Sequence, residues 1–221
     1  MECITVNDLI TIPEVRAYIE KADSFLKGIG YTEHGFRHAE IVSNNAYRIL
    51  KELNFPERSA ELAAIAGLLH DIGNLVGRQD HGVSSALIAK NLLEKLNMHY
   101  AEIIDIMTAI GNHEEESGEV TGNLSAALAI ADKTDVHRSR VRTKEHLAHD
   151  IHDRVNYAVT NSVLKITPSD RCITLDLTID TEMSQVMEYF EIFVSRMVMC
   201  RKAAKFLGCD FHLFINAVKL L

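Results

Sequence analysis

The chain has 221 residues, 47% of them hydrophobic, and a formal net charge of −8. This length suits one domain, or one domain with an appendage, and the hydrophobic content is sufficient for a sizeable core. The acidic balance argues against sequence-independent binding of duplex nucleic acid, because such binding needs Lys and Arg to neutralise many phosphates.

The sequence shows no targeting signal and no disulfide pattern. The N-terminal segment includes acidic Glu2 and Asp8 and lacks an apolar run long enough for a signal peptide. No stretch approaches the roughly 20 apolar residues of a membrane span. The four cysteines are scattered, with no C-x-x-C pair, which predicts reduced thiols and no structural zinc site. We therefore expect a cytoplasmic protein without a membrane partner.

Residues up to about Thr160 predict a helical body. Pro13 after Thr11 is typical of a helix start, and Gly28 and Gly30 are typical of a helix end. Apolar residues then recur at helical spacing, less regularly beyond residue 132. In chain order, the pattern predicts helices over about 13–28, 33–53, 57–69, 83–96, 101–110 and 123–132.

The periodicity changes after Thr160. Apolar Ile173, Leu175, Leu177 and Ile179 alternate with polar residues, which indicates a strand with one buried face. Residues 163–167, ahead of a Pro-Ser-Asp turn, are the expected hairpin partner. A long helix over about 181–207 and a last strand over about 211–218 follow.

Together these patterns predict a mainly α protein. A helical domain over residues 1–160 carries a small α+β appendage over residues 161–221, made of two to three strands and a long helix. The appendage either packs on the helical domain or serves a homodimer.

Histidine carries most of the chemical information, with eleven residues of this type. Imidazole and carboxylate together suit divalent ions such as Mn, Fe, Ni, Co, Zn or Mg. Neighbouring side chains diverge on a helix, but Gly73 allows the backbone to turn so that His70 and Asp71 aim at one point. Six candidate metal ligands lie near predicted helix ends or on an inward helix face: His38, His70, Asp71, His81, His113 and Asp132.

The order His38 … His70-Asp71 … Asp132 resembles the H…HD…D signature of the HD-domain superfamily of metal-dependent phosphohydrolases. The resemblance covers about residues 30–140, and it includes the segments that flank each part of the signature. It implies an all-helical core in which these four residues hold one metal ion.

His81 and His113 resemble the additional histidines of binuclear members of this superfamily. The resemblance implies that they hold a second metal ion, with Asp71 bridging the two. In the HD-GYP branch of the superfamily, a Lys stands where this chain has Asn74, and a Gly-Tyr-Pro element follows the position of His113. Both features are missing here, which argues against the cyclic dinucleotide hydrolysis of that branch.

The resemblance implies two divalent metal ions as cofactors and hydrolysis of a phosphomonoester or phosphodiester, nucleotides included, by a metal-activated hydroxide. Asp71 and Lys133 are the candidate catalytic residues. A small phosphorylated substrate needs cations around it, and a basic cluster follows Asp132. The candidate substrate-binding residues are Lys133, His137, Arg138 and His34.

Further polar residues flank this set. If the helical pattern continues past Asp132, Arg138 and Arg142 share one helix face. Arg78 is a weaker candidate for a phosphate contact because it only neighbours the ligands in sequence. Glu114 or Glu115 is a candidate for orienting a water or a ligand histidine.

Two alternatives share the same ligand set. Some binuclear HD proteins hold iron and oxidise their substrates with dioxygen, and the identity of the ligands alone does not separate them from hydrolases. The other alternative is a non-catalytic sensor or scaffold stabilised by its metal. Retention of all six candidate ligands argues against this last possibility.

Overall fold

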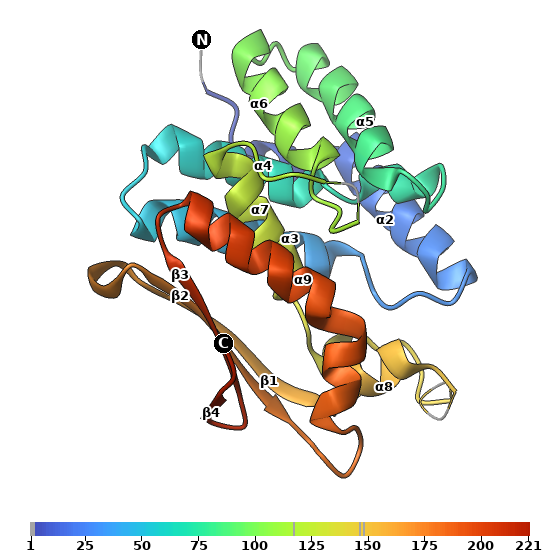
Figure 1. Ribbon diagram of the computed structural model, residues 1–221. Helices are drawn as coiled ribbons and strands as arrows, with labels where there is room; N and C mark the ends of the chain where they lie inside the picture. The colour runs from blue at the N-terminus through green and yellow to red at the C-terminus, as the bar shows by residue number, and fades with distance from the viewer. Residues whose placement is uncertain (1–2, 117, 146, 148) are drawn as a thin grey trace.

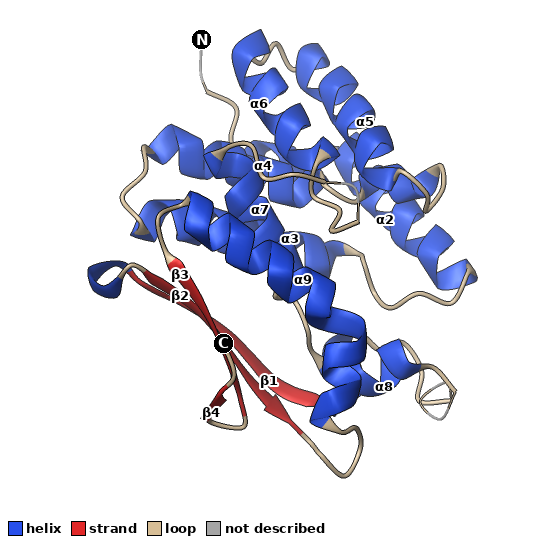
Figure 2. Ribbon diagram, viewed as in Figure 1, coloured by secondary structure: helices blue, strands red, loops and turns tan. Residues whose placement is uncertain are grey.

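The computed structural model describes residues 3–116, 118–145, 147 and 149–221. A body of packed helices occupies one side of the molecule and a small twisted sheet the other, and the long helix α9 (Val186–Phe206) runs between them (Figures 1 and 2). The mainly α fold with a small C-terminal α+β part, expected from the sequence, is therefore confirmed.

The predicted helices are present, with ends that differ from the sequence estimate by a few residues. The chain also forms a short helix that the sequence pattern did not predict, α1, which begins with a capping box between Thr5 and Asp8. The remaining helices are α2 (Pro13–Gly28), α3 (Phe36–Glu52), α4 (Glu57–Leu69), α5 (His81–Lys95), α6 (Tyr100–Gly111), α7 (Asn123–Lys133) and α8 (Ile151–Ala158), and α1 covers Val6–Thr11.

The expected continuation of the helix past Asp132 is wrong. The chain leaves α7 at Lys133, forms a 3-10 turn over Arg138–Arg140 and reaches α8 only at Ile151. The buried Arg140 side chain explains the break, because its guanidinium donates to the backbone oxygen atoms of Asp135 and Glu33. These bonds tie the segment to the chain ahead of α3, so Arg138 and Arg142 do not share a helix face.

Helix α4 lies at the centre of the helical body. From Leu62 to Leu69 all its residues are buried, which explains why the sequence is apolar around the whole helix. Gly67 lets α3 approach closely, since a Cβ atom added there would lie only 2.8 Å from the Cα atom of Ser43. This close contact brings the first turn of α3 beside the end of α4, where the candidate ligands lie.

The sheet contains β1 (Val159–Thr167), β2 (Cys172–Ile179), β3 (Asp210–Ile215) and β4 (Val218–Lys219), in that spatial order. The predicted hairpin is confirmed, because β1 pairs antiparallel with β2 and places Leu164 opposite Leu175. Strand β3 pairs parallel with β2, so the chain needs a crossover between them, and α9 supplies it. The last predicted strand is two strands, because Asn216 and Ala217 turn the chain with positive φ values of 50° and 64°.

Helix α9 joins the sheet to the helical body. It packs against α7 on one side and against β2 and β3 on the other. Tyr189 and Phe193 are among its buried residues and stack with ring centroids 4.8 Å apart. The C-terminal part of the chain thus packs on the helical body, which was one of the two expected arrangements.

Within the described ranges, no helix is both long enough and apolar enough to cross a membrane. The cysteines carry free thiols, with Cys3 exposed and Cys172, Cys200 and Cys209 buried.

Candidate metal centre

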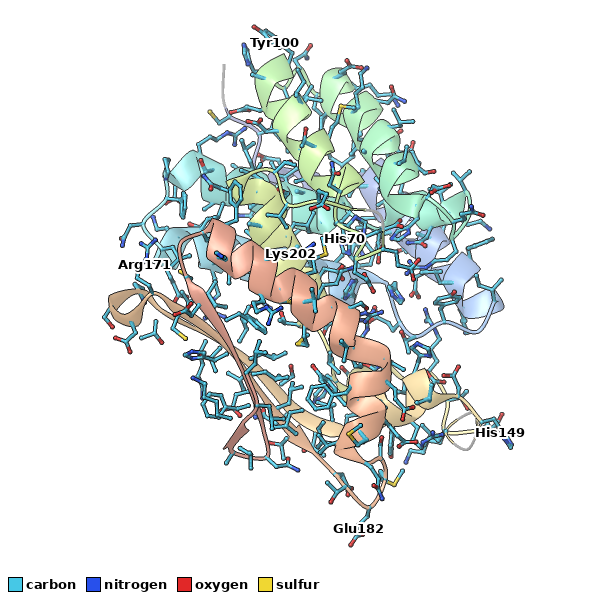
Figure 3. The ribbon with its side chains drawn as sticks, viewed as in Figure 1. His70, Tyr100, His149, Arg171, Glu182 and Lys202 are labelled. Atoms are coloured by element: carbon cyan, nitrogen blue, oxygen red, sulfur yellow. The ribbon has the colours of Figure 1, made fainter. Side chains whose placement is uncertain are left out.

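The six predicted metal ligands come together in one cleft of the helical body. Each is delivered by the end of a helix or by the residue next to it: His38 by the first turn of α3, His70 and Asp71 by the end of α4, His81 by the start of α5, His113 by the end of α6 and Asp132 by the last turn of α7. The four histidines are buried, and the two carboxylate side chains are 11% and 12% exposed. His70 lies among the helices, in the interior of the helical body (Figure 3).

The histidines form two pairs of facing nitrogen atoms. His38 Nε2 and His70 Nε2 are 3.2 Å apart, and His81 Nε2 and His113 Nε2 are also 3.2 Å apart. The carboxylate of Asp71 lies between the pairs. Its Oδ2 atom is 3.4 Å from His70 Nε2, whereas its Oδ1 atom is 3.1 Å from His81 Nε2. One carboxylate therefore faces both nitrogen pairs.

Asp132 lies closest to the first pair. Its Oδ1 atom is 3.4 Å from His38 Nε2 and 3.7 Å from His70 Nε2. Among the described residues, three groups of ligand atoms lie close enough to hold a metal ion: His38, His70 and Asp71; Asp71, His81 and His113; and His70, His113 and Asp132. The last group shows that Asp132 also lies near His113 of the second pair.

The outward nitrogen of each histidine has a fixed partner. In His70 and His113, Nδ1 donates to the backbone oxygen of Gly67 and of Ile110. In His38 it donates to the carboxylate of Asp135 at 2.7 Å. In His81 its nearest partner is the carboxylate of Glu114 at 2.5 Å, with the backbone oxygen of Arg78 at 3.2 Å. A hydrogen bond at Nδ1 leaves the lone pair at Nε2, which faces the cleft in all four rings.

These distances and donors fit divalent metal ions. Metal–imidazole bonds of about 2.0–2.1 Å place two neighbouring ligand atoms roughly 2.8–3.4 Å apart, from octahedral to tetrahedral coordination. The 3.2 Å separation within each nitrogen pair lies in this range. Neutral imidazoles with ionised carboxylates are also the donor set that borderline divalent ions prefer.

Both carboxylates are held in the ionised form. Burial opposes the charge on Asp71, but His70 and His81 outweigh it and hold the pKa of this carboxyl well below its ordinary value. Burial likewise opposes the charge on Asp132, and Lys133 together with His38 holds its pKa well below the ordinary value. Burial lowers the pKa of His113 to about 3, so this imidazole is neutral and its Nε2 atom is free to bind a cation.

Asp135 is a site residue that the sequence analysis missed. Besides accepting from His38, its carboxylate accepts two hydrogen bonds from Arg37, at 3.2 and 2.9 Å. A carboxylate that holds the outer nitrogen of a ligand histidine fixes the ring and strengthens the metal bond. Its position three residues after Asp132, one helical turn away, is the sequence signal that could have identified it.

Glu114 fixes His81 in the way expected for a residue next to a ligand. Its Oε1 atom is 2.5 Å from His81 Nδ1 and also accepts from the backbone N–H of Gly82 at 2.9 Å. Asn74 contacts the predicted bridging ligand, because its side-chain amide donates to Asp71 Oδ1 at 2.9 Å.

Gly73 allows α5 to reach the cleft. A Cβ atom at this position would lie 2.4 Å from both the backbone oxygen of His81 and the backbone nitrogen of Ser85. The backbone N–H of Gly73 instead donates to Ser85 Oγ at 2.8 Å. The glycine is needed for this close approach, in addition to the backbone turn expected from the sequence.

Comparison with known proteins identifies a domain within the chain. Residues 35–137 match the family model of the HD domain. This part of the chain is an HD domain. All six candidate ligands lie within the matched HD domain, whereas α8, α9 and the sheet lie outside it.

Two curated relatives and one solved structure resemble the chain. An uncharacterized protein of Methanocaldococcus jannaschii is 31% identical over 158 residues, which are 62% of this chain and 61% of that protein. Ribonuclease Y of Lawsonia intracellularis is 31% identical over 126 residues, which are 53% of this chain and 23% of that protein. The chain therefore spans less than two thirds of either relative. A crystal structure of a predicted HD superfamily hydrolase from an uncultured Thermotogales bacterium is 25% identical, with a TM-score of 0.45 over 61% of this chain and 75% of that one.

Of the predicted substrate-binding residues, Lys133 and His34 line the HD-domain cleft. The buried Lys133 Nζ atom lies 2.8 Å from Asp132 Oδ2 and 2.6 Å from Glu115 Oε2. The His34 ring packs edge-on against His38, with centroids 5.3 Å apart. Its Nδ1 atom donates to the backbone oxygen of Thr32, which leaves Nε2 available to the cleft.

His137 and Arg138 lie elsewhere. His137 lines a separate cavity between the HD domain and β1, together with Ser162. The guanidinium of Arg138 lies over the ring of Tyr157, 5.2 Å from its centroid. Their assignment as substrate-binding residues stays a prediction.

The cleft contains three arginines besides Lys133. Arg78, Arg140 and Arg196 all line it. Arg78 was a weak candidate in sequence, and Arg140 belongs to the basic cluster after Asp132 but was not among the named candidates. Arg196 went unnoticed, because it belongs to α9, about 60 residues beyond the last ligand, and only the packing of α9 on α7 brings it to the site.

Proposed function

We propose that this protein hydrolyses a phosphoester with the help of two divalent metal ions. The main support for this proposal is the pair of facing Nε2 atoms on each side of the Asp71 carboxylate. His38, His70, Asp71 and Asp132 would hold one ion, and His81, His113 and Asp71 the other. When bound, such ions acidify water and offset negative charge on a phosphoryl group.

The chain's own residues prepare this site in two ways. Asp135, Glu114 and three backbone carbonyls hold the histidine rings in the orientation that turns Nε2 inward. Lys133 holds Asp132 through its 2.8 Å ion pair. Burial opposes the charge on Lys133, but Asp132 and Glu115 outweigh it and raise its pKa above the ordinary value, so the lysine keeps its charge beside the cleft.

Positive charge around the cleft favours a phosphorylated substrate over the alternatives. Arg78, Lys133, Arg140 and Arg196 converge there in a chain whose net charge is −8. Phosphate oxygens need such cations. An oxidation by dioxygen does not require them, and neither does a purely structural metal.

Metal content tests the binuclear centre. Elemental mass spectrometry of the purified protein should give close to two divalent ions per chain, and the His81→Ala variant should give close to one. His149→Ala is the matched control, because His149 is exposed and lies at the edge of the molecule, far from His70 (Figure 3). One ion or none in the wild type, unchanged in His81→Ala, would contradict a second site.

Activity tests the reaction. The protein loaded with Mn, Fe, Co or Ni should release p-nitrophenol from p-nitrophenyl phosphate or from bis(p-nitrophenyl) phosphate, and His81→Ala should lose most of this activity. The diester is included because one relative is by name a ribonuclease. Consumption of dioxygen without phosphoester cleavage would support the oxygenase alternative. A metal-loaded protein with neither activity would support the structural one.

A further inference from the structure

A cavity of about 340 Å³ adjoins the metal cleft. It shares four residues with the cleft, namely His34, Arg78, Arg140 and Arg196, so the two spaces meet along a wall that contains three arginines. Small-molecule sites commonly have volumes of about 300–1,000 Å³. The cavity is therefore large enough for a compact organic group placed next to the metals.

The walls of this cavity come mainly from outside the matched HD domain. The loop after α2 contributes Tyr31 and His34, and the C-terminal part of the chain contributes Asn156 from α8 with Phe193 and Arg196 from α9. The HD domain supplies the metal ligands, whereas neighbouring segments supply most of the adjoining space.

Two of the arginines have hydrogen-bonding groups left over. Arg196 Nε donates to Glu115 at 3.0 Å, and its terminal amino groups have no hydrogen bond within the described part of the chain. Arg78 uses one amino group, Nη1, which donates to Asn74 Oδ1 at 3.2 Å and also lies 3.3 Å from His81 Nε2; its other amino group has no hydrogen bond within the described part of the chain. Each guanidinium lies over an aromatic ring, Arg196 over Phe193 at 4.8 Å and Arg78 over Tyr31 at 5.3 Å. Stacking fixes the guanidinium plane and leaves its edge free for phosphate oxygens.

Lys133 and Arg140 are less available. Lys133 forms ion pairs with two carboxylates. The guanidinium of Arg140 donates hydrogen bonds to the backbone oxygens of Glu33 and Asp135. Arg78 and Arg196 are therefore the cations best able to bind a ligand.

Asn156 provides a second indication of a ligand. The residue is 5% exposed, and its amide nitrogen donates to the backbone oxygen of His152 at 2.9 Å. Its Oδ1 atom is buried and has no hydrogen-bond partner among the described residues. Buried polar atoms are nearly always hydrogen-bonded, so this unpaired acceptor, on a residue that lines the cavity, is a candidate partner for a donor of a bound molecule.

We propose that this cavity binds the organic group of a phosphomonoester, with Arg78 and Arg196 on the phosphate oxygens and Asn156 Oδ1 accepting from a hydroxyl or amino group. The inference rests on the proposed function and names the substrate class of that site. Another cavity that shares Glu115 with the cleft measures only about 40 Å³, which is too small for a second organic group. A monoester, with one organic group, therefore fits these two cavities better than a diester.

Binding to the metal-loaded full chain tests the proposal independently of turnover. Isothermal titration calorimetry would compare inorganic phosphate with ribose 5-phosphate, glucose 6-phosphate and the nucleoside 5′-monophosphates. At least one of these organic monophosphates should bind about tenfold more tightly than inorganic phosphate, and the series distinguishes a sugar phosphate from a nucleotide. Equal affinity for all of them and for inorganic phosphate would overturn the proposal.

Substitutions test the contact to the organic group and the contact to the phosphate separately. Asn156→Leu should reduce the affinity for the preferred monophosphate roughly tenfold, because it removes the acceptor, and should leave inorganic phosphate unchanged. Arg196→Lys should weaken both ligands by a similar factor, because lysine cannot reproduce the stacked, bidentate contact. The controls are Asn91→Leu on α5 and Arg201→Lys on α9, both at exposed positions, and Asn156→Ala replaces the leucine variant if that variant does not fold.

The outcomes distinguish this inference from the proposed function. Selective binding that depends on Asn156 and Arg196, without turnover of any phosphoester, would support the cavity and contradict the hydrolase. Turnover of phosphomonoesters with affinities that neither variant changes would support the hydrolase and overturn the cavity assignment.

Discussion

The metal cleft and the cavity beside it differ in how completely their polar groups are paired. In the cleft, each histidine has a partner for its outer nitrogen, and Asp71 and Asp132 are surrounded by nitrogen donors. In the cavity wall, Asn156 has a buried oxygen without a partner, and Arg196 has unused donors. The paired groups of the HD domain therefore suit metal binding, whereas the α8 and α9 region leaves polar groups that a ligand could bind.

Removing the proposed bridging ligand, Asp71, should have the largest effect on metal content and turnover. Asp71→Asn takes a charge away from both nitrogen pairs at once, so metal content should fall from near two ions to less than one per chain. Turnover should fall by more than the roughly 100-fold upper range seen for residues that only orient a ligand. Elemental mass spectrometry and phosphoester assays measure both, with Asp105→Asn on the exposed face of α6 as control. Retention of two ions would show that Asp71 does not bridge.

Asp135→Asn should have the next largest effect, because it weakens the partner that orients His38 without touching the metal. Metal affinity should fall roughly 10–100-fold, measured by competition with a fluorescent chelator. His81 and His113 do not contact Asp135, so only one of the two metal-binding steps should weaken. An unchanged titration would mean that the 2.7 Å contact between His38 and Asp135 has no role in metal binding.

Gly73→Ala should reduce stability by about 1–3 kcal/mol, the usual range for forced overpacking. The added methyl group would meet the backbone of His81 and Ser85 at 2.4 Å, so the first turn of α5 must move. Urea unfolding measures the change in the free energy of unfolding. Gly77→Ala is the matched control, because a Cβ atom there meets nothing within 4 Å. Equal stability of the two variants would contradict the close packing of α5.

The smallest effect on stability is expected at the junction of α8 and α9, the two helices that contribute residues to the cavity wall. Arg154 donates to Glu188 at 2.5 and 3.1 Å, and this pairing, with a hydrogen bond from Ser184, lowers the pKa of Glu188 to about 2. Because the pair is partly exposed, Glu188→Gln should cost only about 0.5–1 kcal/mol at neutral pH.

The pH dependence of this loss follows from the lowered pKa. A carboxyl whose pKa is lower in the folded state stabilises the protein fully above its unfolded pKa of about 4.3. The stabilisation is lost as pH falls towards the folded value of about 2. The difference in unfolding free energy between wild type and Glu188→Gln should therefore shrink between these pH values, with Glu191→Gln on the exposed face of α9 as control. A difference that stays constant would contradict the pairing.

The sequence determined most of the helical body and identified the candidate metal ligands. The bounds of α4 were predicted from Pro56, an apolar run and the following His70-Asp71, all of which are local signals. The six ligands were predicted from their residue types, from their places at helix ends and from the resemblance to HD domains. The hairpin of β1 and β2 followed from the alternation of apolar residues, since a period of two belongs to one strand and needs no knowledge of its neighbours.

The contacts between residues outside these local patterns are seen only in the tertiary structure. It placed Asp135 behind His38, Arg140 in a buried turn where a helix had been expected, and Arg196 and Asn156 at the cavity beside the metals. Apart from the spacing of Asp135 from Asp132, none of these residues has a periodic or motif signal, because each acts through contacts with segments distant in sequence. Periodicity reports which face of an element is buried, whereas the meeting of side chains from separate elements depends on how α8 and α9 pack against the HD domain.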